Sequence, residues 1–278
     1  EREKAYTTAE PKGGCEGQLE FRHELRFDGV SFTFDDGHTP VVDKVSFVVK
    51  PGSRVAIVGG SGAGKTTIAK LILGLHTPTG GAITVDGVDA ISERCRWQNN
   101  LAFVPQDIYL MDLPLCENVA FDHLRTDVDW PKLERSISLA HLEDFVATLP
   151  QGLDTPVGER GVRLSGGQRQ RLGLARALYR GASVLVLDEA TSALDNATER
   201  RISETLADLP SEITTIVIAH RLSTVKDADQ IILLNNGKIA GTGTFSELAH
   251  RSTEFAQLIA LGSLELDDSS EVIPGAAQ

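Results

Sequence analysis

A glycine-rich stretch in the first quarter of the chain is the feature that most constrains the fold. It reads Gly-Gly-Ser-Gly-Ala-Gly-Lys-Thr-Thr over residues 59–67 and follows an apolar run at Val55–Val58. Apolar residues at i, i+3, i+4 and i+7 come after it, namely Ile68, Leu71, Ile72 and Leu75. The first run predicts a short buried strand and the second pattern predicts a helix. Strand, glycine loop and helix in this order are the context of a P-loop.

The residue types of this stretch suit the binding of a nucleoside triphosphate. Glycines let the backbone curl so that successive N–H groups point at phosphate oxygens, and the helix start adds its positive dipole end. Lys65 is expected to reach the outer phosphates, and the Thr66 hydroxyl is expected to hold Mg²⁺. An ordinary glycine-rich turn is the alternative, which the flanking strand and helix disfavour. The predicted ATP-binding residues here are Gly59, Gly60, Ser61, Gly62, Ala63, Gly64, Lys65, Thr66 and Thr67.

Length and composition narrow the class of protein. A chain of 278 residues accommodates one large domain or two small ones, and its net charge of −12 argues against nucleic acid as the main partner. No stretch approaches the roughly 18 apolar residues of a membrane helix, and no signal peptide is seen. Cys15, Cys95 and Cys116 fit no zinc spacing and no disulfide framework, which favours a reducing compartment. The first residue is Glu1 rather than Met, so the chain is expected to be a piece of a longer one.

Patterns before and after the glycine stretch predict a small antiparallel sheet beside the nucleotide-binding core. Leu25–Phe34 alternates, with Phe34 on the same side as its apolar neighbours. Further strands are expected at Val45–Lys50 and at Ala82–Val85, the latter ending in a tight turn. Residues 1–18 are polar and are expected to form a lead-in, and residues 265–278 are expected to form a disordered tail. The remaining residues, 19–264, then form the folded unit.

The middle of the chain has a helical pattern from Leu101 to Leu164. Asp129 is expected to cap one helix, with Leu133, Ile137 and Ala140 on its buried face, and a second helix near Leu142–Leu149 stops at Pro150. This predicts a helical insertion at about 107–165 within an α/β core.

The last third of the chain returns to strand patterns. Apolar runs at Val184–Leu187 and Ile213–Ala219 suit strands buried on both faces of a parallel sheet. Asn236-Gly237 signals a hairpin, and Thr244 with Glu247 forms a capping box for a closing helix.

Acidic and imidazole side chains follow the two predicted core strands. Asp188 and Glu189 end the first run and His220 closes the second. Because ligands bind at the carboxyl ends of parallel strands, Asp188 is expected to hold Mg²⁺ and Glu189 to activate the attacking water. His220 is expected to bond the γ-phosphate. A solvated strand end and a structural histidine are the alternatives.

A second anion-binding helix start lies at Leu164–Gln168. Ser165 is a good N-cap, and Gly166 and Gly167 expose the helix amides, with Gln168 completing the motif. One ATP already has its phosphates wrapped by the P-loop. The second site is therefore expected to serve an ATP bound to another copy of the chain; a capped surface helix is the alternative.

These motifs together resemble the nucleotide-binding domain of an ATP-binding-cassette (ABC) transporter. The sequences GGSGAGKTT, LSGGQ, VLVLDEA and SALD, followed by His220, occur in the family's order over about Leu25–Leu261. The resemblance implies a P-loop ABC ATPase core with a mostly parallel sheet, a small antiparallel β-subdomain and an inserted α-helical subdomain. It also implies two domains, expected to be identical, that dimerise on Mg-ATP at the cytoplasmic face of a membrane. A transmembrane domain is expected to precede the ATPase in the same polypeptide.

The resemblance assigns roles to further positions. Gln106 matches the Q-loop, which contacts Mg²⁺ and the attacking water and faces the transmembrane partner. Ser192–Asp195 matches the D-loop, which joins the two ATP sites. Thr155–Gly161 and Ile218–Thr224 resemble exporter segments. Phe34 stands where the family has an adenine-stacking aromatic, most often Tyr, so the departure removes a hydroxyl but keeps a π-face; a core role for Phe34 is the alternative.

Three rival functions remain at this point. A soluble ABC ATPase acting on DNA or ribosomes would carry coiled coils, paired cassettes or basic surfaces, and this sequence shows none of them. An importer ATPase would show a regulatory domain or a different segment around Thr155–Gly161. A dimer held by ATP without hydrolysis is disfavoured because Glu189 and His220 are both present. The cargo is chosen by membrane helices and is not encoded in this stretch.

Overall fold

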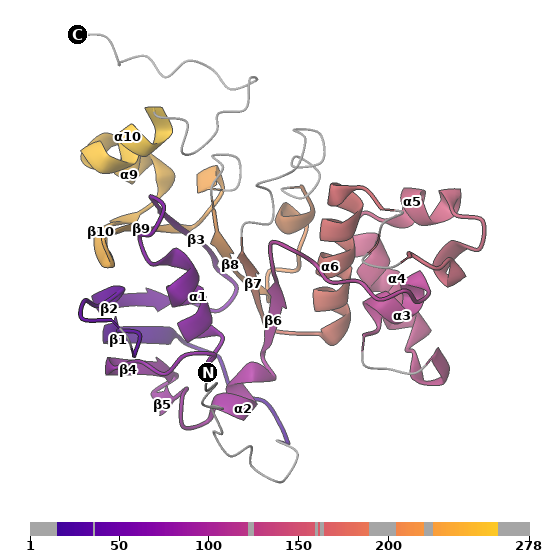
Figure 1. Ribbon diagram of the computed structural model, residues 1–278, viewed down its shortest axis with the longest axis horizontal. Coiled ribbons are helices and arrows are strands. Elements are labelled where there is room, and N and C mark those ends of the chain that lie inside the picture. The colour runs from indigo at the N-terminus through magenta and orange to yellow at the C-terminus, as the bar shows by residue number, and fades with distance from the viewer. Residues whose placement is uncertain are drawn as a thin grey trace, which may run out of the picture.

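The computed structural model describes residues 16–35, 37–121, 125–158, 161, 164–188, 204–219 and 225–260. Two β-sheets lie beside each other at one side of the molecule, and a group of helices lies at the other side (Figure 1). The predicted combination of an α/β core, a small antiparallel sheet and a helical part is confirmed.

The small sheet is antiparallel, with strand order β2-β1-β4-β5. Its strands are β1 (Leu25–Phe32), β2 (Val42–Val49), β4 (Gly80–Val85) and β5 (Val88–Asp89). β1 pairs with β2 on one side and with β4 on the other. The rings of Phe27 and Phe47 stack across the β1–β2 pair with centroids 4.4 Å apart. The alternating pattern therefore predicted this sheet correctly.

The large sheet has the order β10-β9-β3-β8-β7-β6. Its strands are β3 (Arg54–Gly59), β6 (Leu101–Val104), β7 (Val184–Asp188), β8 (Thr214–Ile218), β9 (Gln230–Asn235) and β10 (Lys238–Gly243). All neighbours are parallel except β9 and β10, which form the predicted hairpin. Every residue of β8 is buried, as expected for a strand covered on both faces.

Helices cover both faces of the large sheet. α1 (Lys65–Ile72) packs through Ile68 and Ile72 on the face that carries Val55 and Ile57 of β3. The opposite face is covered by α6 (Gly166–Arg180), α9 (Phe245–Arg251) and α10 (Thr253–Ala260). Figure 1 shows α1 and α6 on opposite sides of the strands. The two helix starts singled out in the sequence therefore belong to different layers.

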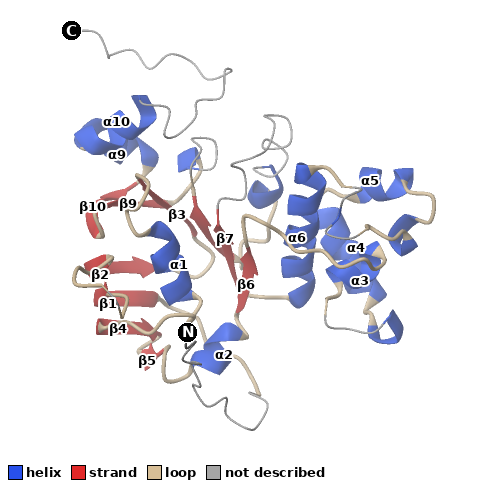
Figure 2. Ribbon diagram, in the orientation of Figure 1, coloured by secondary structure: helices blue, strands red, loops and turns tan. Residues whose placement is uncertain are grey.

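A helical region completes the fold on the outer side of α6 (Figure 2). It contains α3 (Leu115–Val119), α4 (Trp130–Leu139) and α5 (Glu143–Thr148), with 3₁₀ turns at Arg125–Asp127 and Gly152–Asp154. Asp129 caps α4 by accepting a hydrogen bond from the Lys132 N–H at 3.1 Å. Leu133, Ile137 and Ala140 are buried, as predicted. A further short helix, α2 (Arg94–Gln98), precedes β6.

Two expectations about secondary structure are wrong. Leu101–Val104 forms strand β6, paired with β7, although the helical pattern was expected to start at Leu101; a four-residue apolar run fits either element, and its place beside β7 decides. Leu75 is not on α1 but 58% exposed beyond its end. Gly74 adopts φ 65°, and the N–H groups of Gly74 and Leu75 bond to the carbonyls of Leu71 and Lys70. This Schellman arrangement stops the helix one turn earlier than the apolar spacing suggests.

The structure overturns one interpretation of the cysteines. Cys95 is disulfide-bonded, so the interpretation that the cysteines form no bridge is wrong. Spacing along a sequence does not report the distance between two sulfurs in space.

Within the expected lead-in, Gly17 and Gln18 already hydrogen-bond to Asn99. In the described part of the chain, each helix is too short or too polar to cross a membrane. The expected tail at 265–278 lies outside the described residues.

Candidate functional site

The carboxyl edge of the parallel strands brings together three of the predicted positions. β3 ends at Gly59, β7 ends at Asp188, and β6 ends two residues before Gln106. Asp188 and Ile57 both pair with Ile218 on the strand between them, so two strand spacings, roughly 10 Å, separate their backbones. The glycine loop, Asp188 and Gln106 therefore share one edge of the large sheet.

The glycine loop surrounds the ammonium group of its own lysine. Lys65 is buried, and its Nζ donates hydrogen bonds to the carbonyls of Gly59 at 2.8 Å and Gly60 at 3.0 Å. The Cα atoms of Gly60 and Gly62 face open space. A positive charge thus lies inside a backbone curl whose outer side is open, which is the arrangement that binds phosphate oxygens.

The start of α1 is shaped by Gly64. This residue is the N-cap, has φ 100°, and no side chain caps the helix. A Cβ at this position would lie 2.9 Å from the Val41 carbonyl oxygen, so the segment between β1 and β2 packs directly on the loop. The Thr66 side chain is exposed at the first turn and Thr67 is buried. The first turn of α1 therefore presents its amide end and a hydroxyl to a ligand.

The oxygen donors at this edge fit a magnesium ion. Thr66 supplies a hydroxyl, Asp188 a carboxylate and Gln106 an amide oxygen, the hard ligands that Mg²⁺ prefers together with water. Asp188 is half-buried at the end of β7. The backbone carbonyl of Gln106 accepts a hydrogen bond from Gln170 Nε2 on α6 at 3.2 Å, which fixes the backbone of this residue against α6.

The second predicted motif forms the capped start of α6. Ser165 Oγ accepts from the Gln168 N–H at 3.2 Å, and Gln168 Oε1 accepts from the Ser165 N–H at 2.8 Å. Ser165 is exposed, Gly166 is half-buried and Gly167 is buried. The Ser165 hydroxyl group can still donate its proton to a ligand, because the capping box uses only the oxygen as an acceptor. The motif is therefore both a helix cap and an exposed donor site.

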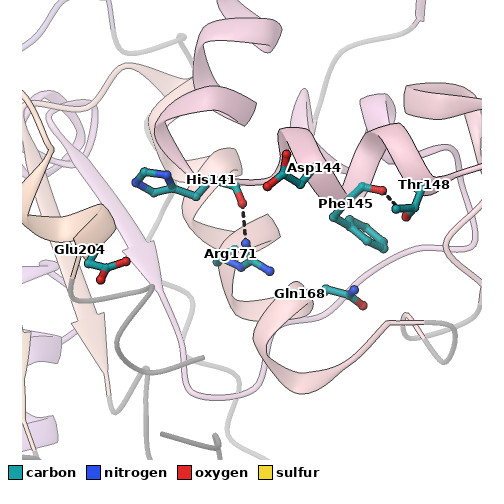
Figure 3. Close-up of a pocket in the computed structure, with 7 residues that line it drawn as sticks. All are labelled: His141, Asp144, Phe145, Thr148, Gln168, Arg171 and Glu204. Carbon is teal, nitrogen blue, oxygen red and sulfur yellow. Dashed lines mark hydrogen bonds between the residues drawn. The ribbon is translucent and has the colours of Figure 1, made fainter. Parts of the chain in front are cut away.

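A pocket of about 430 Å³ opens beside the first turns of α6 and is shown in Figure 3. Arg171 of α6 donates to the His141 carbonyl, and His141 Nε2 lies 3.4 Å from Asp208 Oδ2. Asp144 and Glu204 add negative charge to the rim. Among the described residues that line this pocket none belongs to the glycine loop, but Gln168 belongs to the second predicted motif, so the pocket lies beside the start of α6.

The segment after Gln106 runs along α6 in register. Gln170 bonds to Gln106, a Cβ at Gly173 would collide with Ile108 Cδ1, and Arg176 donates to the Tyr109 carbonyl at 3.0 Å. Arg176 also donates to the Asn118 carbonyl at 2.9 Å, and burial lowers the pKa of its guanidinium. We call these contacts the α6 seam. Sequence reasoning missed the seam, because its partners are far apart along the chain.

Phe34 lies just beyond β1 and is 48% exposed, so the core alternative for this ring is excluded. Its ring meets Phe32 edge to face at 5.0 Å and His76 edge to face at 5.7 Å. Phe32 and His76 stack on each other at 4.7 Å. His76 was not singled out in the sequence, and nothing in its spacing could have found it.

Several predicted positions lie outside the described residues. They are Glu189, His220, the segment Ser192–Asp195, and Glu159 and Arg160 of the exporter-like segment. Their roles stay predictions.

Comparisons with known proteins agree with the motifs. The ABC transporter family profile matches residues 42–192. The ATP-dependent lipid A-core flippase of Burkholderia orbicola (strain AU 1054) is 43% identical over 251 residues, which cover 90% of this chain and 42% of the relative. The protein of the same name from Xylella fastidiosa (strain 9a5c) is 43% identical over 258 residues, covering 92% of this chain and 42% of the relative.

A solved structure shares the fold. A bacterial Atm1-family ABC exporter with ATP bound superposes with a TM-score of 0.80 at 40% identity, covering 92% of this chain and 44% of that chain. The chain thus spans less than half the length of the relatives it matches. The resemblance inferred from the motifs is confirmed: the chain belongs to the ABC transporter family and corresponds to the ATP-binding and hydrolysing domain of its exporter-type members.

Proposed function

We propose that two copies of this chain clamp two Mg-ATP molecules, each between the glycine loop of one copy and the Ser165 turn of the other, and hydrolyse them. The observation that carries the proposal is the placement of the two exposed helix starts. The loop at Gly64 opens α1 on one face of the large sheet, and the turn at Ser165 opens α6 on the opposite face. Because the two starts belong to different layers of the fold, we assign the second half of each site to a second copy.

The residues have separate tasks in this proposal. The amides of the glycine loop and Lys65 bind and neutralise the phosphates, and the Ser165 turn of the second copy adds donors from the other side. Thr66, Asp188 and Gln106 hold the magnesium ion, which neutralises charge on the phosphates when bound. Glu189 orients and deprotonates the attacking water, and His220 donates to the γ-phosphate. Phe34 stacks on the adenine ring.

The coupling of ATP-driven closure to a membrane domain is proposed from the relatives. They are named flippases and an exporter and are more than twice as long as this chain. We infer a transmembrane domain in the same polypeptide, two identical ATPase domains at the cytoplasmic face of the membrane, and closure on ATP that moves the membrane part. The flippases and the Atm1-family exporter are each about 40% identical to this chain, so similarity of the ATPase domain does not select the cargo.

The first test uses Glu189→Gln. Removing the carboxylate leaves the binding surface intact but removes the base, so we expect turnover to fall by about a thousandfold while ATP still binds. Size-exclusion chromatography with Mg-ATP should show accumulated dimers, with Lys65→Ala as the control that stays monomeric. Full turnover by Glu189→Gln would remove this residue from the mechanism.

The second test asks whether the two halves of a site come from different chains. Lys65→Ala and Ser165→Arg should each inactivate the protein. In a mixed dimer one site regains both an intact lysine loop and an intact serine turn, so mixing the two variants should restore about a quarter of the wild-type rate. A mixture no more active than its components would contradict the shared site. Doubly substituted protein mixed with wild type controls for dilution.

Two observations discriminate the rivals. Salt-sensitive binding to DNA or RNA would support a soluble ABC ATPase acting on nucleic acid. An encoding gene without membrane spans would support an importer-type subunit with a separate membrane protein. A gene that begins with membrane spans fused to this chain supports the exporter proposed here.

A further inference from the structure

Three aromatic rings from two separate parts of the chain meet beside the glycine loop. Phe32 ends β1, Phe34 follows that strand, and His76 follows the turn that ends α1. His76 stacks on Phe32 with an interplanar angle of 18°, and Phe34 stands against both rings at 85° and 89°. We call this group the aromatic cluster. The rings of Phe32 and His76 are stacked, and the ring of Phe34 is perpendicular to both.

The aromatic cluster is attached to the nucleotide loop through backbone. The Val41 N–H donates to the Phe32 carbonyl at 2.8 Å, which closes the loop that carries Phe34. The next atoms along this segment approach Gly64, because the Val41 carbonyl oxygen lies 2.9 Å from where its Cβ would be. His76 is joined to the same helix from its other end, since α1 runs from Lys65 to Ile72. The aromatic cluster and the phosphate loop are therefore both connected to α1.

The His76 ring makes two aromatic contacts and a backbone hydrogen bond to Leu75. Its Nε2 atom is buried, and no described residue hydrogen-bonds to it. Burial, with a smaller contribution from Lys70, holds the pKa of this imidazole below its ordinary value, so the ring is neutral at pH 7. A buried polar atom without a partner is unfavourable for folding. Because the buried Nε2 makes no hydrogen bond to a described residue, the contacts that hold this ring are chiefly those of its face and edge, which a phenyl group could also make.

We propose that His76 is the positioning residue for base recognition: with Phe32 it fixes the upright orientation of Phe34, so that the exposed face of Phe34 is ready to stack on a purine. This inference rests on the proposed ATP site and deepens it. Without His76, an exposed phenylalanine beyond a strand end samples several rotamers. Holding it in one orientation before the nucleotide arrives lowers the entropic cost of binding.

The test is His76→Ala, read with two ligands. Affinity for ATP should fall about three- to tenfold, the range expected for losing a well-placed aromatic contact. Affinity for inorganic triphosphate, measured by competition, should stay unchanged because the phosphate loop is untouched. In ATPase assays KM for ATP should rise by the same factor while kcat at saturation stays at the wild-type value.

Two further variants make the result decisive. His76→Phe keeps a ring that can stack on Phe32, so it should restore the wild-type KM, whereas a requirement for imidazole would appear as failure to rescue. His250→Ala, on the exposed face of α9, is the matched control and should change neither ligand. Equal loss of ATP and triphosphate affinity in His76→Ala would overturn the inference in favour of general damage to α1.

Phe34→Ala separates failure of this inference from failure of the proposed site. If Phe34→Ala weakens ATP binding and His76→Ala does not, Phe34 stacks without help and only the positioning role is wrong. If Phe34→Ala has no effect on ATP affinity, adenine stacking at this position is itself wrong, and the inference falls with it.

Discussion

The starts of α1 and α6 present two solutions to the same problem, the unpaired amides at a helix N-terminus. α1 begins at Gly64 in a left-handed conformation, and no side chain caps it. α6 begins at Ser165, and Ser165 and Gln168 close a reciprocal capping box. Both are rich in glycine and both suit an anion. They differ in the hydrogen bonds of their first amide groups: a side chain caps α6, and no side chain caps α1.

This difference assigns the two starts different roles. A helix end without a side-chain cap gains most from a ligand, so in the proposed site α1 is the primary phosphate-binding element. A capped helix end is stable without a ligand. In the proposed dimer, the exposed end of α6 contacts the nucleotide that the other copy binds. The α6 start is also held from behind, by Arg171 on the His141 carbonyl and by the α6 seam. It is therefore a stable surface rather than a loop that forms on binding.

The first test of this comparison adds a methyl group at the α1 start. Gly64→Ala places a Cβ in a positive-φ residue against the Val41 carbonyl, so we expect ATP affinity to fall at least tenfold, measured by calorimetry. Gly87→Ala is the matched control, because Gly87 has φ 83° with open space around it in the β4–β5 turn. That variant should lose stability but keep its ATP affinity. Equal affinities in the two variants would contradict a special role for the α1 start.

Ser165→Asp tests whether the α6 start does more than cap. Aspartate is as good an N-cap as serine, so the melting temperature should change little. A carboxylate facing phosphate repels it, so turnover should fall about a hundredfold and ATP-driven dimers should disappear. Ser165→Asn caps without the charge and should retain much more activity. Normal turnover in Ser165→Asp would reduce the motif to a surface cap.

Gly173→Ala tests the α6 seam. Alanine favours the helix by about 1 kcal/mol, but overpacking against Ile108 costs about 1–3 kcal/mol, so the net effect on stability should be a modest loss. Displacing Ile108 should also move Gln106 and lower kcat about threefold to tenfold. Ile108→Val removes Cδ1, so the double variant should recover most of kcat, with a stability near that of wild type because the lost methyl group offsets the helix gain. No recovery would show that the collision is not the cause.

The smallest effect concerns the chemistry of the cap itself. α9 uses the same box as α6, but with ionisable Glu247 in place of Gln168. Hydrogen bonds from Thr244 hold the pKa of Glu247 below its ordinary value. The folded-state pKa is the lower one, so this stabilisation is present above the unfolded-state pKa near 4.5 and is lost as pH falls through the folded-state pKa. Melting curves of wild type and Glu247→Gln should therefore differ in pH dependence only in the acidic range; parallel curves there would contradict the coupling.

The sequence predicted the fold and much of the candidate site because their signals are local. The glycine loop, both capping boxes, the Asn236-Gly237 hairpin and the Asp129 cap each depend on residues within a few positions of one another. Periodicity predicted the covered strands β7 and β8. It failed for Leu101–Val104, whose four residues have too few repeats to separate strand from helix. It failed for Leu75, because the helix stop at Gly74 interrupts an apolar pattern that continues past it.

What the sequence by itself determined is the chemistry of each short motif, since hydrogen bonds across three or four residues follow from residue type and spacing. The tertiary structure alone decided that the two helix starts lie on opposite faces of one sheet, that Asp188 and Gln106 share an edge with the glycine loop, and that His76 supports Phe34. These contacts join residues far apart along the chain. They depend on strand order and on which face each helix covers, and neither is written in any local pattern.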